Sequence, residues 1–347
     1  MAAMIEDQAA SLRRLFGGST LNSVLLAGGD AGIGQTALVA NVAHALAIRG
    51  HAVLVIDAQP QLRSGARWFS LTPRGDLGDA LAGTRRLDEV MLQAPSGLSW
   101  LPAAQLRHAR GHTHEGMGGR GAIGPGSPAR TDARGGAGPG ASAERVVAEL
   151  GTRFDTVLID VPADRLAYWW PVAAHAGTVV LGSTEQQRSI TAAYAALKSL
   201  AWQVGQQRYL WWIARAAGQA SAEATYNKVA QTARRFLSLS LGFAGYIPAD
   251  PMVGRAERLR RPLAQAFPSS PSAGACTRLA ERLGTLPQDA QAADLLWQAL
   301  VGIEAQTLGN AALAAAAPPL PTLRGTTDRA PDRMPIGARG RTALVSR

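Results

Sequence analysis

One stretch near the N-terminus constrains the fold of this chain more than any other. An apolar run, Val24–Ala27, leads into the glycine-rich stretch Gly28-Gly29-Asp30-Ala31-Gly32-Ile33-Gly34-Gln35-Thr36, and an apolar helix pattern follows up to Gly50. The spacing Gly29-x4-Gly34-x-Thr36 fits the phosphate-binding pattern G-x-x-x-x-G-K-[ST], except that Gln35 stands at the lysine position. Backbone N–H groups and a helix N-terminus still favour a phosphate there, but the lysine charge is missing. The sequence therefore predicts a strand–loop–helix unit of a nucleotide-binding kind that lacks one of its main charges.

Short apolar runs alternate with longer helix-like runs along the chain. The predicted strands are Val24–Ala27, Ala52–Ile56, Thr156–Ile159, Thr178–Leu181, Tyr209–Ile213 and Phe243–Ile247. The predicted helices are Thr36–Arg49, Glu144–Leu150, Ile190–Val204 and Ala222–Leu239. Near-continuous apolar strands joined by helices are typical of a parallel sheet that is buried on both faces. We therefore predict an α/β fold with a doubly wound, mostly parallel sheet flanked by helices.

The net charge of +10 does not indicate nucleic-acid binding. Much of the excess comes from five arginines against two acids in 106–143 and six against two in 324–347. The first segment is rich in glycine and the second follows a proline-rich stretch, so we expect both to be disordered. Nucleic-acid readers usually concentrate positive charge on one folded face. A single cysteine, no signal-peptide pattern and no long apolar run lead us to expect a cytoplasmic protein.

Three polar residues of the predicted sheet and loop could surround a magnesium ion. Asp57 follows the strand Val53–Ile56, and Asp160 follows Val157–Ile159. Carboxylates at the carboxyl ends of parallel strands are well placed for the ligand crevice, and Thr36 supplies a hydroxyl. Taken alone, either aspartate would more often cap a loop or a helix than bind a ligand. Together with the loop, they favour descent from a nucleotide-binding protein.

The loop resembles that of the MinD/ParA group of P-loop ATPases, which reads K-G-G-x-G-K-[ST]. Within that group the chain is similar to the FlhG family (also called FleN or YlxH). The similarity is carried by Asp7–Arg13, Leu71–Gly83, Leu101–Ala103, Ile190–Tyr194, Gly245–Pro251, Arg261–Leu263 and Phe267–Ser270. It covers about residues 5–283, apart from the glycine-rich insertion.

The resemblance implies a regulator of flagellum number and placement. It implies that Asp7, Gln8, Leu12 and Arg13 contact an FlhF-type flagellar GTPase, alongside other flagellar regulators, and that a homodimer can form. It also implies contact with the inner membrane, at a cell pole or peripherally, through a C-terminal amphipathic helix. The corresponding stretch Leu295–Ile303 lacks a basic face, so the sequence favours packing on the domain.

These inferences divide the chain into four parts. Residues 1–18 form the partner-binding segment, and 19–285 form a MinD-like domain with a disordered insertion at about 106–143. Residues 286–313 form a C-terminal helical segment, and 314–347 form a disordered tail rich in proline and arginine.

The nucleotide site that the resemblance implies comprises Gly29, Gly32, Gly34, Gln35, Thr36, Asp57, Asp160, Pro248 and Asp250, with Thr36, Asp57 and Asp160 around the metal ion. Several family features are absent. Both lysines are gone, and Asp30 reverses the charge at the first. Gln59 stands where the family has an aspartate implicated in hydrolysis, and Ala214 replaces an asparagine that reads adenine. The family's D-T-G-A-G here reads Asp160–Asp164, with a proline at its third position and an acid at its last.

A carboxylate about 4 Å from a phosphate charge costs roughly 4 kcal/mol at an effective dielectric of 20. We therefore expect weak ATP or ADP binding with Mg²⁺, or none, and no catalytic residue. Three interpretations stay open: a regulator with little or no hydrolysis, a working MinD-type switch that dimerises with ATP, and another MinD/ParA descendant.

Overall fold

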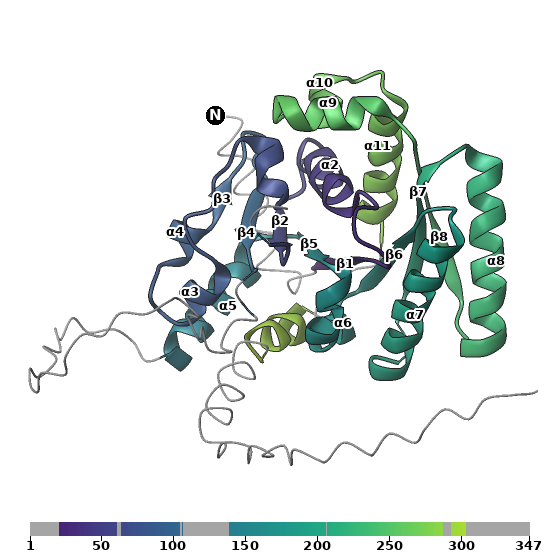
Figure 1. Cartoon of the computed structure of the whole chain (residues 1–347). Coiled ribbons are helices and arrows are strands. Elements are labelled where there is room, and N and C mark those ends of the chain that lie inside the picture. The colour runs from purple at the N-terminus through teal and green to yellow at the C-terminus, as the bar shows by residue number, and fades with distance from the viewer. Residues whose placement is uncertain are drawn as a thin grey trace, which may run out of the picture.

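A single sheet lies at the centre of the molecule, with helices on both of its faces (Figure 1). The computed structural model describes residues 21–60, 64–104, 106, 139–205, 207–286 and 293–302. Over these residues eight strands are ordered β3-β4-β2-β5-β1-β6-β7-β8, and every pairing is parallel except that of β3 with β4. The strands are β1 (Asn22–Gly28), β2 (Val53–Asp57), β3 (Leu92–Gln93), β4 (Ser99–Pro102), β5 (Thr156–Val161), β6 (Thr178–Ser183), β7 (Tyr209–Ala216) and β8 (Leu241–Pro248). The predicted α/β, doubly wound fold is confirmed.

The central strands are apolar throughout because both faces of the sheet are covered. In β1, Leu25 and Ala27 belong to the hydrophobic core on one face, whereas Val24 and Leu26 belong to the core on the other. All four are fully buried. A strand of this kind cannot alternate between apolar and polar residues, since neither side meets water.

The helices divide between the two cores. The first core is covered by α3 (Leu77–Leu81), α4 (Leu87–Val90), α5 (Pro139–Arg153), α6 (Trp170–His175), α7 (Gln187–Gln203) and α8 (Gln219–Leu237). The second core is covered by α2 (Gln35–Ala47), α9 (Pro251–Leu259), α10 (Leu263–Ala266) and α11 (Pro271–Gly284). Two short 3₁₀ helices, η2 (Gly65–Phe69) and η3 (Ala163–Trp169), follow β2 and β5.

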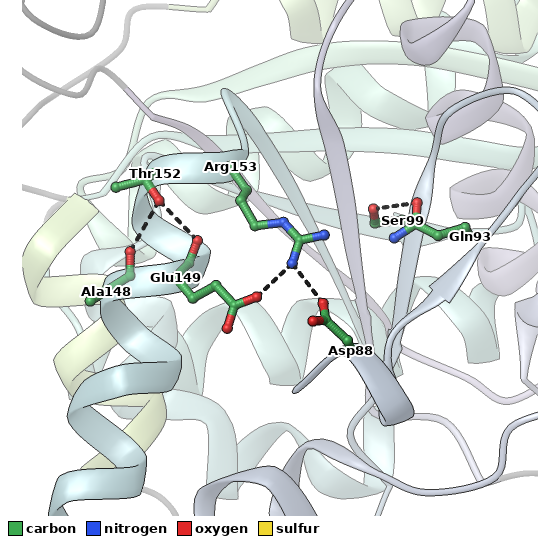
Figure 2. A network of polar contacts seen from close by, with 7 residues as sticks. All are labelled: Asp88, Gln93, Ser99, Ala148, Glu149, Thr152 and Arg153. Carbon is green, nitrogen blue, oxygen red and sulfur yellow. Dashed lines mark hydrogen bonds and ion pairs between the residues drawn. The ribbon is translucent and has the colours of Figure 1, made fainter. Parts of the chain in front are cut away.

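An ion-pair network joins two elements near the β3–β4 side of the sheet (Figure 2). One Nη atom of Arg153, at the end of α5, lies 2.7 Å from Oε1 of Glu149 on the same helix. The same atom lies 3.1 Å from Oδ1 of Asp88 on α4. These side chains are partly exposed, so the pairs add little stability but fix how α5 approaches α4.

The chain returns to the first core in a helix over residues 293–302. Ala293, Leu296, Trp297 and Leu300 are buried in that core, while Leu295 remains 44% exposed. The apolar side of this helix therefore faces the protein, as the sequence favours, and Ile303 lies outside the described residues. None of the helices in the described ranges is long and apolar enough to cross a bilayer.

Several elements differ from the sequence prediction. Helix α5 begins at Pro139, five residues before the predicted start, and Leu106 at the predicted start of the insertion is buried. Strands β3 and β4 were not predicted because they are short, and β4 contains a serine and a proline. Residues 107–138, the tail 314–347 and the N-terminal segment 1–18 lie outside the described residues.

Candidate functional site

The loop between β1 and α2 has a backbone shape suited to phosphate. Gly32 (φ 80°) and Gly34 (φ 92°) both lie in the left-handed region, and Gly34 is the N-cap of α2. A Cβ on Gly29 would lie 2.0 Å from the backbone nitrogen of Ala193 in α7. The backbone N–H of Gly29 donates to the carbonyl of Gly182 at 3.2 Å. The glycines therefore allow both the turn and its close contact with β6 and α7.

The side chain of Gln35 turns back into the protein. It is 7% exposed, and its amide nitrogen lies 3.0 Å from the carbonyl oxygen of Leu26 and 2.9 Å from that of Val161. The same nitrogen lies 2.5 Å from Oδ1 of Asp160. A glutamine amide carries two N–H donors and no charge. The side chain therefore links the ends of β1 and β5 and brings no positive charge to the loop.

Asp57 is surrounded by protein donors at the end of β2. The hydroxyl of Ser64 (2.6 Å), the N–H of Gly65 (3.1 Å) and the indole N–H of Trp100 (2.9 Å) all donate to Oδ2. The backbone N–H of Gln59 donates to Oδ1 at 2.9 Å. Both carboxylate oxygens thus already have hydrogen-bond donors, and the residue is 1% exposed.

Asp160 lies beside Asp57 on the neighbouring strand, and the two residues are paired in the sheet register. Its Oδ1 accepts from the amide nitrogens of Gln35 (2.5 Å) and Gln59 (3.0 Å). The residue is completely buried. Two carboxylates are therefore held next to each other in the protein interior, and both side-chain amides that reach them are neutral.

Burial is the main reason why the pKa values of both carboxyls lie above the ordinary aspartate value. Burial, and then the charge of Asp160, raise the pKa of Asp57 to about 7, although hydrogen bonds from Ser64, Gln59 and Trp100 lower it. Burial also raises the pKa of Asp160, against hydrogen bonds from Gln59, Gln35 and Thr36. At neutral pH the pair therefore carries less negative charge than two exposed aspartates would.

The structure places Thr36, Asp57 and Asp160, the predicted metal-binding residues, close to one another, but as a poor set of magnesium ligands. Mg²⁺ requires near-ideal octahedral geometry with oxygen ligands. Here both oxygens of Asp57 and Oδ1 of Asp160 already accept hydrogen bonds from the protein, whereas Oδ2 of Asp160 is buried and has no hydrogen-bond partner among the described residues. A metal ion could use that one oxygen freely but would have to displace protein donors from the other three, so the carboxylates form an incomplete set of ligands. No cluster of three or more metal-binding side chains occurs among the described residues.

Asp30 makes an ion pair at the outer side of the loop. Its Oδ2 lies 3.1 Å from a guanidinium nitrogen of Arg188 at the start of α7. The Arg188 side chain is 86% exposed and that of Asp30 is 28% exposed. Solvent screens such a pair, so its effect on stability is small. The Asp30 carboxylate of the loop thus has the Arg188 guanidinium as its partner.

A cavity of about 250 Å³ lies between the loop and the ends of β7 and β8. Its lining includes Gly34, Ala214, Pro248 and Asp250. The carboxylate of Asp250 caps α9 by accepting from the N–H of Met252 at 2.8 Å. Burial opposes ionisation of Asp250, but hydrogen bonds from serine hydroxyls and backbone N–H groups outweigh it and lower the pKa. Pro248 and Asp250, which the sequence assigns to a nucleotide site, line this cavity, and Asp250 also has a structural role.

Some residues at the site carry no motif in the sequence. Ser64 and Trp100, which hold Asp57, come from a turn and a short strand outside the loop pattern. Arg165 is 7% exposed, and one Nη donates to the carbonyls of Ala58 (3.0 Å) and Ala104 (2.6 Å). Only the three-dimensional arrangement of the strand ends reveals these contacts. The predicted partner-binding residues Asp7, Gln8, Leu12 and Arg13 lie outside the described residues.

Known proteins match most of this chain. The family profile described as the CobQ/CobB/MinD/ParA nucleotide binding domain matches residues 24–263. The chain is 26% identical over 264 residues to the antiactivator FleN of Pseudomonas aeruginosa, which covers 76% of this chain and 86% of FleN.

Two solved structures share the fold. The MinD cell division protein of Aquifex aeolicus has a TM-score of 0.54 at 18% identity, covering 76% of this chain and 96% of that chain. The septum site-determining protein MinD of Pyrococcus horikoshii, complexed with Mg-ADP, has a TM-score of 0.51 at 18% identity with the same coverage. The two structures share the fold, the family profile confirms the predicted MinD/ParA relationship, and the match to FleN agrees with the predicted resemblance to the FlhG/FleN family.

Proposed function

The chain belongs to the CobQ/CobB/MinD/ParA family of nucleotide-binding domains, and on that premise we propose that it regulates flagellum number and placement through protein contacts, with little or no ATP hydrolysis. Its similarity to FleN, whose name describes it as an antiactivator, supports the flagellar role. The observation that carries the proposal is the neutral Gln35 side chain, which bonds to Asp160 and to the carbonyls of β1 and β5.

Phosphoryl transfer depends almost entirely on positioning and on charge stabilisation by lysine, metal ions and a residue that orients water. Each of these parts is altered in this chain. Gln35 supplies no charge, the oxygens of Asp57 are hydrogen-bonded within the protein, and Gln59 donates to Asp160. These contacts support a site in which nucleotide, if bound at all, is held weakly by the loop backbone and Thr36.

An ATPase assay on the purified protein tests the proposed lack of hydrolysis. We expect no appreciable phosphate release with Mg-ATP, and the same background from Thr36→Ala. Thr36 is the matched control because its hydroxyl is the loop group that a working site requires for the metal. Robust ATP turnover by the wild type that disappears in Thr36→Ala would contradict the proposal.

We propose further that Asp7, Gln8, Leu12 and Arg13 bind an FlhF-type GTPase, and that this contact acts at the cell pole or the inner membrane. The support is the similarity of the N-terminal segment to the family's D-Q-A-x-x-L-R text. In a pull-down, deletion of residues 1–14 should abolish capture of the GTPase, whereas deletion of the tail 314–347 should leave it unchanged. Unchanged capture after the N-terminal deletion would refute this assignment.

A second candidate is a MinD-type switch that dimerises with ATP. The left-handed glycines of the loop favour it, because Gly32 and Gly34 still give the turn a phosphate-binding shape. The related MinD complexed with Mg-ADP shows that the shared fold can hold this ligand. Light scattering discriminates the two candidates, since only the switch predicts that the molar mass doubles on addition of Mg-ATP.

A further inference from the structure

Strand β8 forms one edge of the sheet, and a groove of about 500 Å³ follows it. Helices α8 and α11 both pack on β8, one for each face of the sheet (Figure 1). The groove is lined by residues of β8 itself and by polar side chains of both helices. It therefore exposes a sheet edge between two helical walls.

The floor of the groove offers both backbone groups and apolar side chains. Phe243 and Tyr246 pack toward the α8 side, whereas Ala244 and Ile247 pack toward the α11 side. On an edge strand, alternate N–H and C=O groups point away from the sheet and can pair with another strand. A bulge at Ala244 interrupts the register with β7, and Gly245 (φ 129°) follows it. A Cβ on Gly245 would meet no atom within 4 Å, so there is open space at this point.

The two helical walls of the groove carry opposite charges. Only the charged side chain on the α8 wall has a hydrogen-bond partner in the part of the chain that the structure describes. On α11, Arg278 and Arg282 are exposed and stand one helical turn apart. No ion pair joins either arginine to another described residue. On α8, Glu223 already accepts a hydrogen bond from Gln219 at 2.9 Å. The α11 wall therefore carries positive charge that has no ion-pair partner among the described residues.

We propose that this groove binds an extended segment of a partner protein, which adds a strand to β8 and carries acidic residues at alternate positions. Successive residues of a strand point to opposite faces, so residues i and i+2 share one face about 6.6–6.8 Å apart. Side chains one helical turn apart are separated by a similar rise of about 6 Å. Acids at i and i+2 can thus face Arg278 and Arg282, while apolar residues between them face Phe243 and Tyr246.

This docking site is independent of the nucleotide loop and adds to the proposed function. Strand addition uses main-chain hydrogen bonds for affinity and alternate side chains for specificity. The chemistry selects a segment that alternates acidic and apolar residues. A segment with the same composition but with its acids three residues apart would place neighbouring acids on opposite faces, so only one acid at a time would face the two arginines.

The test uses the full-length protein and a fluorescent peptide, Thr-Glu-Val-Glu-Phe-Glu-Val-Thr. The control is a peptide of the same composition with its acids three residues apart, Glu-Val-Thr-Glu-Phe-Thr-Glu-Val. Anisotropy measures binding to wild type, to the double variant Arg278→Glu with Arg282→Glu, and to Arg234→Glu with Arg235→Glu. The last pair makes the same charge change on exposed α8 residues that do not line the groove. Hydrogen exchange of amides 241–247 then locates the bound peptide.

We expect the alternating peptide to bind wild type, to lose about tenfold or more in affinity in the α11 variant, and to change little in the α8 variant. We also expect slower exchange of the β8 amides when the peptide is present. Equal losses in the two variants, or equal binding of the control peptide, would mean that net charge alone attracts the peptide and would overturn the proposal. Absence of binding, or unchanged exchange in β8, would overturn it as well.

Discussion

At the scale of single residues, the hydrogen bonds of Gln35 and Asp57 explain why we propose that the site binds a nucleotide and a metal ion weakly. Gln35 directs its amide to Asp160 and to two backbone carbonyls, and Asp57 receives donors from Ser64, Gly65, Trp100 and Gln59. A buried polar group that already has partners resists a competing ligand, because each displaced group would be left unpaired. Protein donors thus occupy every oxygen of the two carboxylates except Oδ2 of Asp160, which is buried without a hydrogen-bond partner among the described residues.

The raised pKa of Asp57 makes stability depend on pH. The folded-state value of about 7 lies above the model value of 3.8, so the folded protein binds this proton more tightly than the unfolded chain does. The contribution of this carboxyl to the free energy of unfolding is therefore fully present below about pH 4 and is lost as the pH rises through 7. We expect Asp160→Asn, which removes the neighbouring charge, to stabilise the protein by about 1–3 kcal/mol at pH 8 and by less at pH 5.

Urea unfolding at the two pH values measures this effect. Asp88→Asn is the control, because Asp88 is an exposed acid whose side chain is 58% accessible. A loss of stability in Asp160→Asn that is as large at pH 8 as at pH 5 would contradict the assignment of a repulsive buried pair.

At the scale of elements, patterns of apolar residues predicted the central strands and the helices α2, α5, α7 and α8, but not α11 (Pro271–Gly284). The run Val24–Ala27 and the strand ending at Asp57 needed only local sequence, because strands buried on both faces are apolar throughout. The β3–β4 pair and the cage around Asp57 could not be predicted in this way. Trp100 reaches Asp57 only because β4 lies beside β2, and this pairing is a long-range property of the fold.

The helix over residues 293–302 gives a prediction at this scale. Trp297 is 1% exposed and belongs to the core shared with α5, where it also approaches Gly151. Trp297→Ala should lower the free energy of unfolding by about 3–5 kcal/mol, because it removes a large buried side chain. Leu295→Ala on the exposed side of the same helix should change it little. Thermal unfolding that is equally affected by both variants would contradict the docked position of the helix.

At the scale of the whole molecule, the family fold is retained, while several side chains at its centre depart from the pattern that the family resemblance implies. The order of the strands brings the ends of β1, β2 and β5 together, so the loop, Asp57 and Asp160 meet as the sequence predicts. The local sequence identified these residues but not the groups that donate hydrogen bonds to their carboxylates. Ser64 and Gln59 come within hydrogen-bond distance of Asp57 only in the folded protein. On the proposed function, the molecule acts through surfaces that it presents to other proteins, and we propose the β8 edge as one of them.

The most direct test of the central claim is calorimetric titration of Mg-ATP and Mg-ADP into wild type and into Gln35→Lys. The variant restores a charge beside Asp160 at the site where the wild-type amide now bonds. We predict that wild type binds no nucleotide more tightly than about 1 mM, and that the variant binds Mg-ATP about tenfold or more tightly than wild type. Micromolar binding by wild type that Gln35→Lys fails to improve would contradict the account.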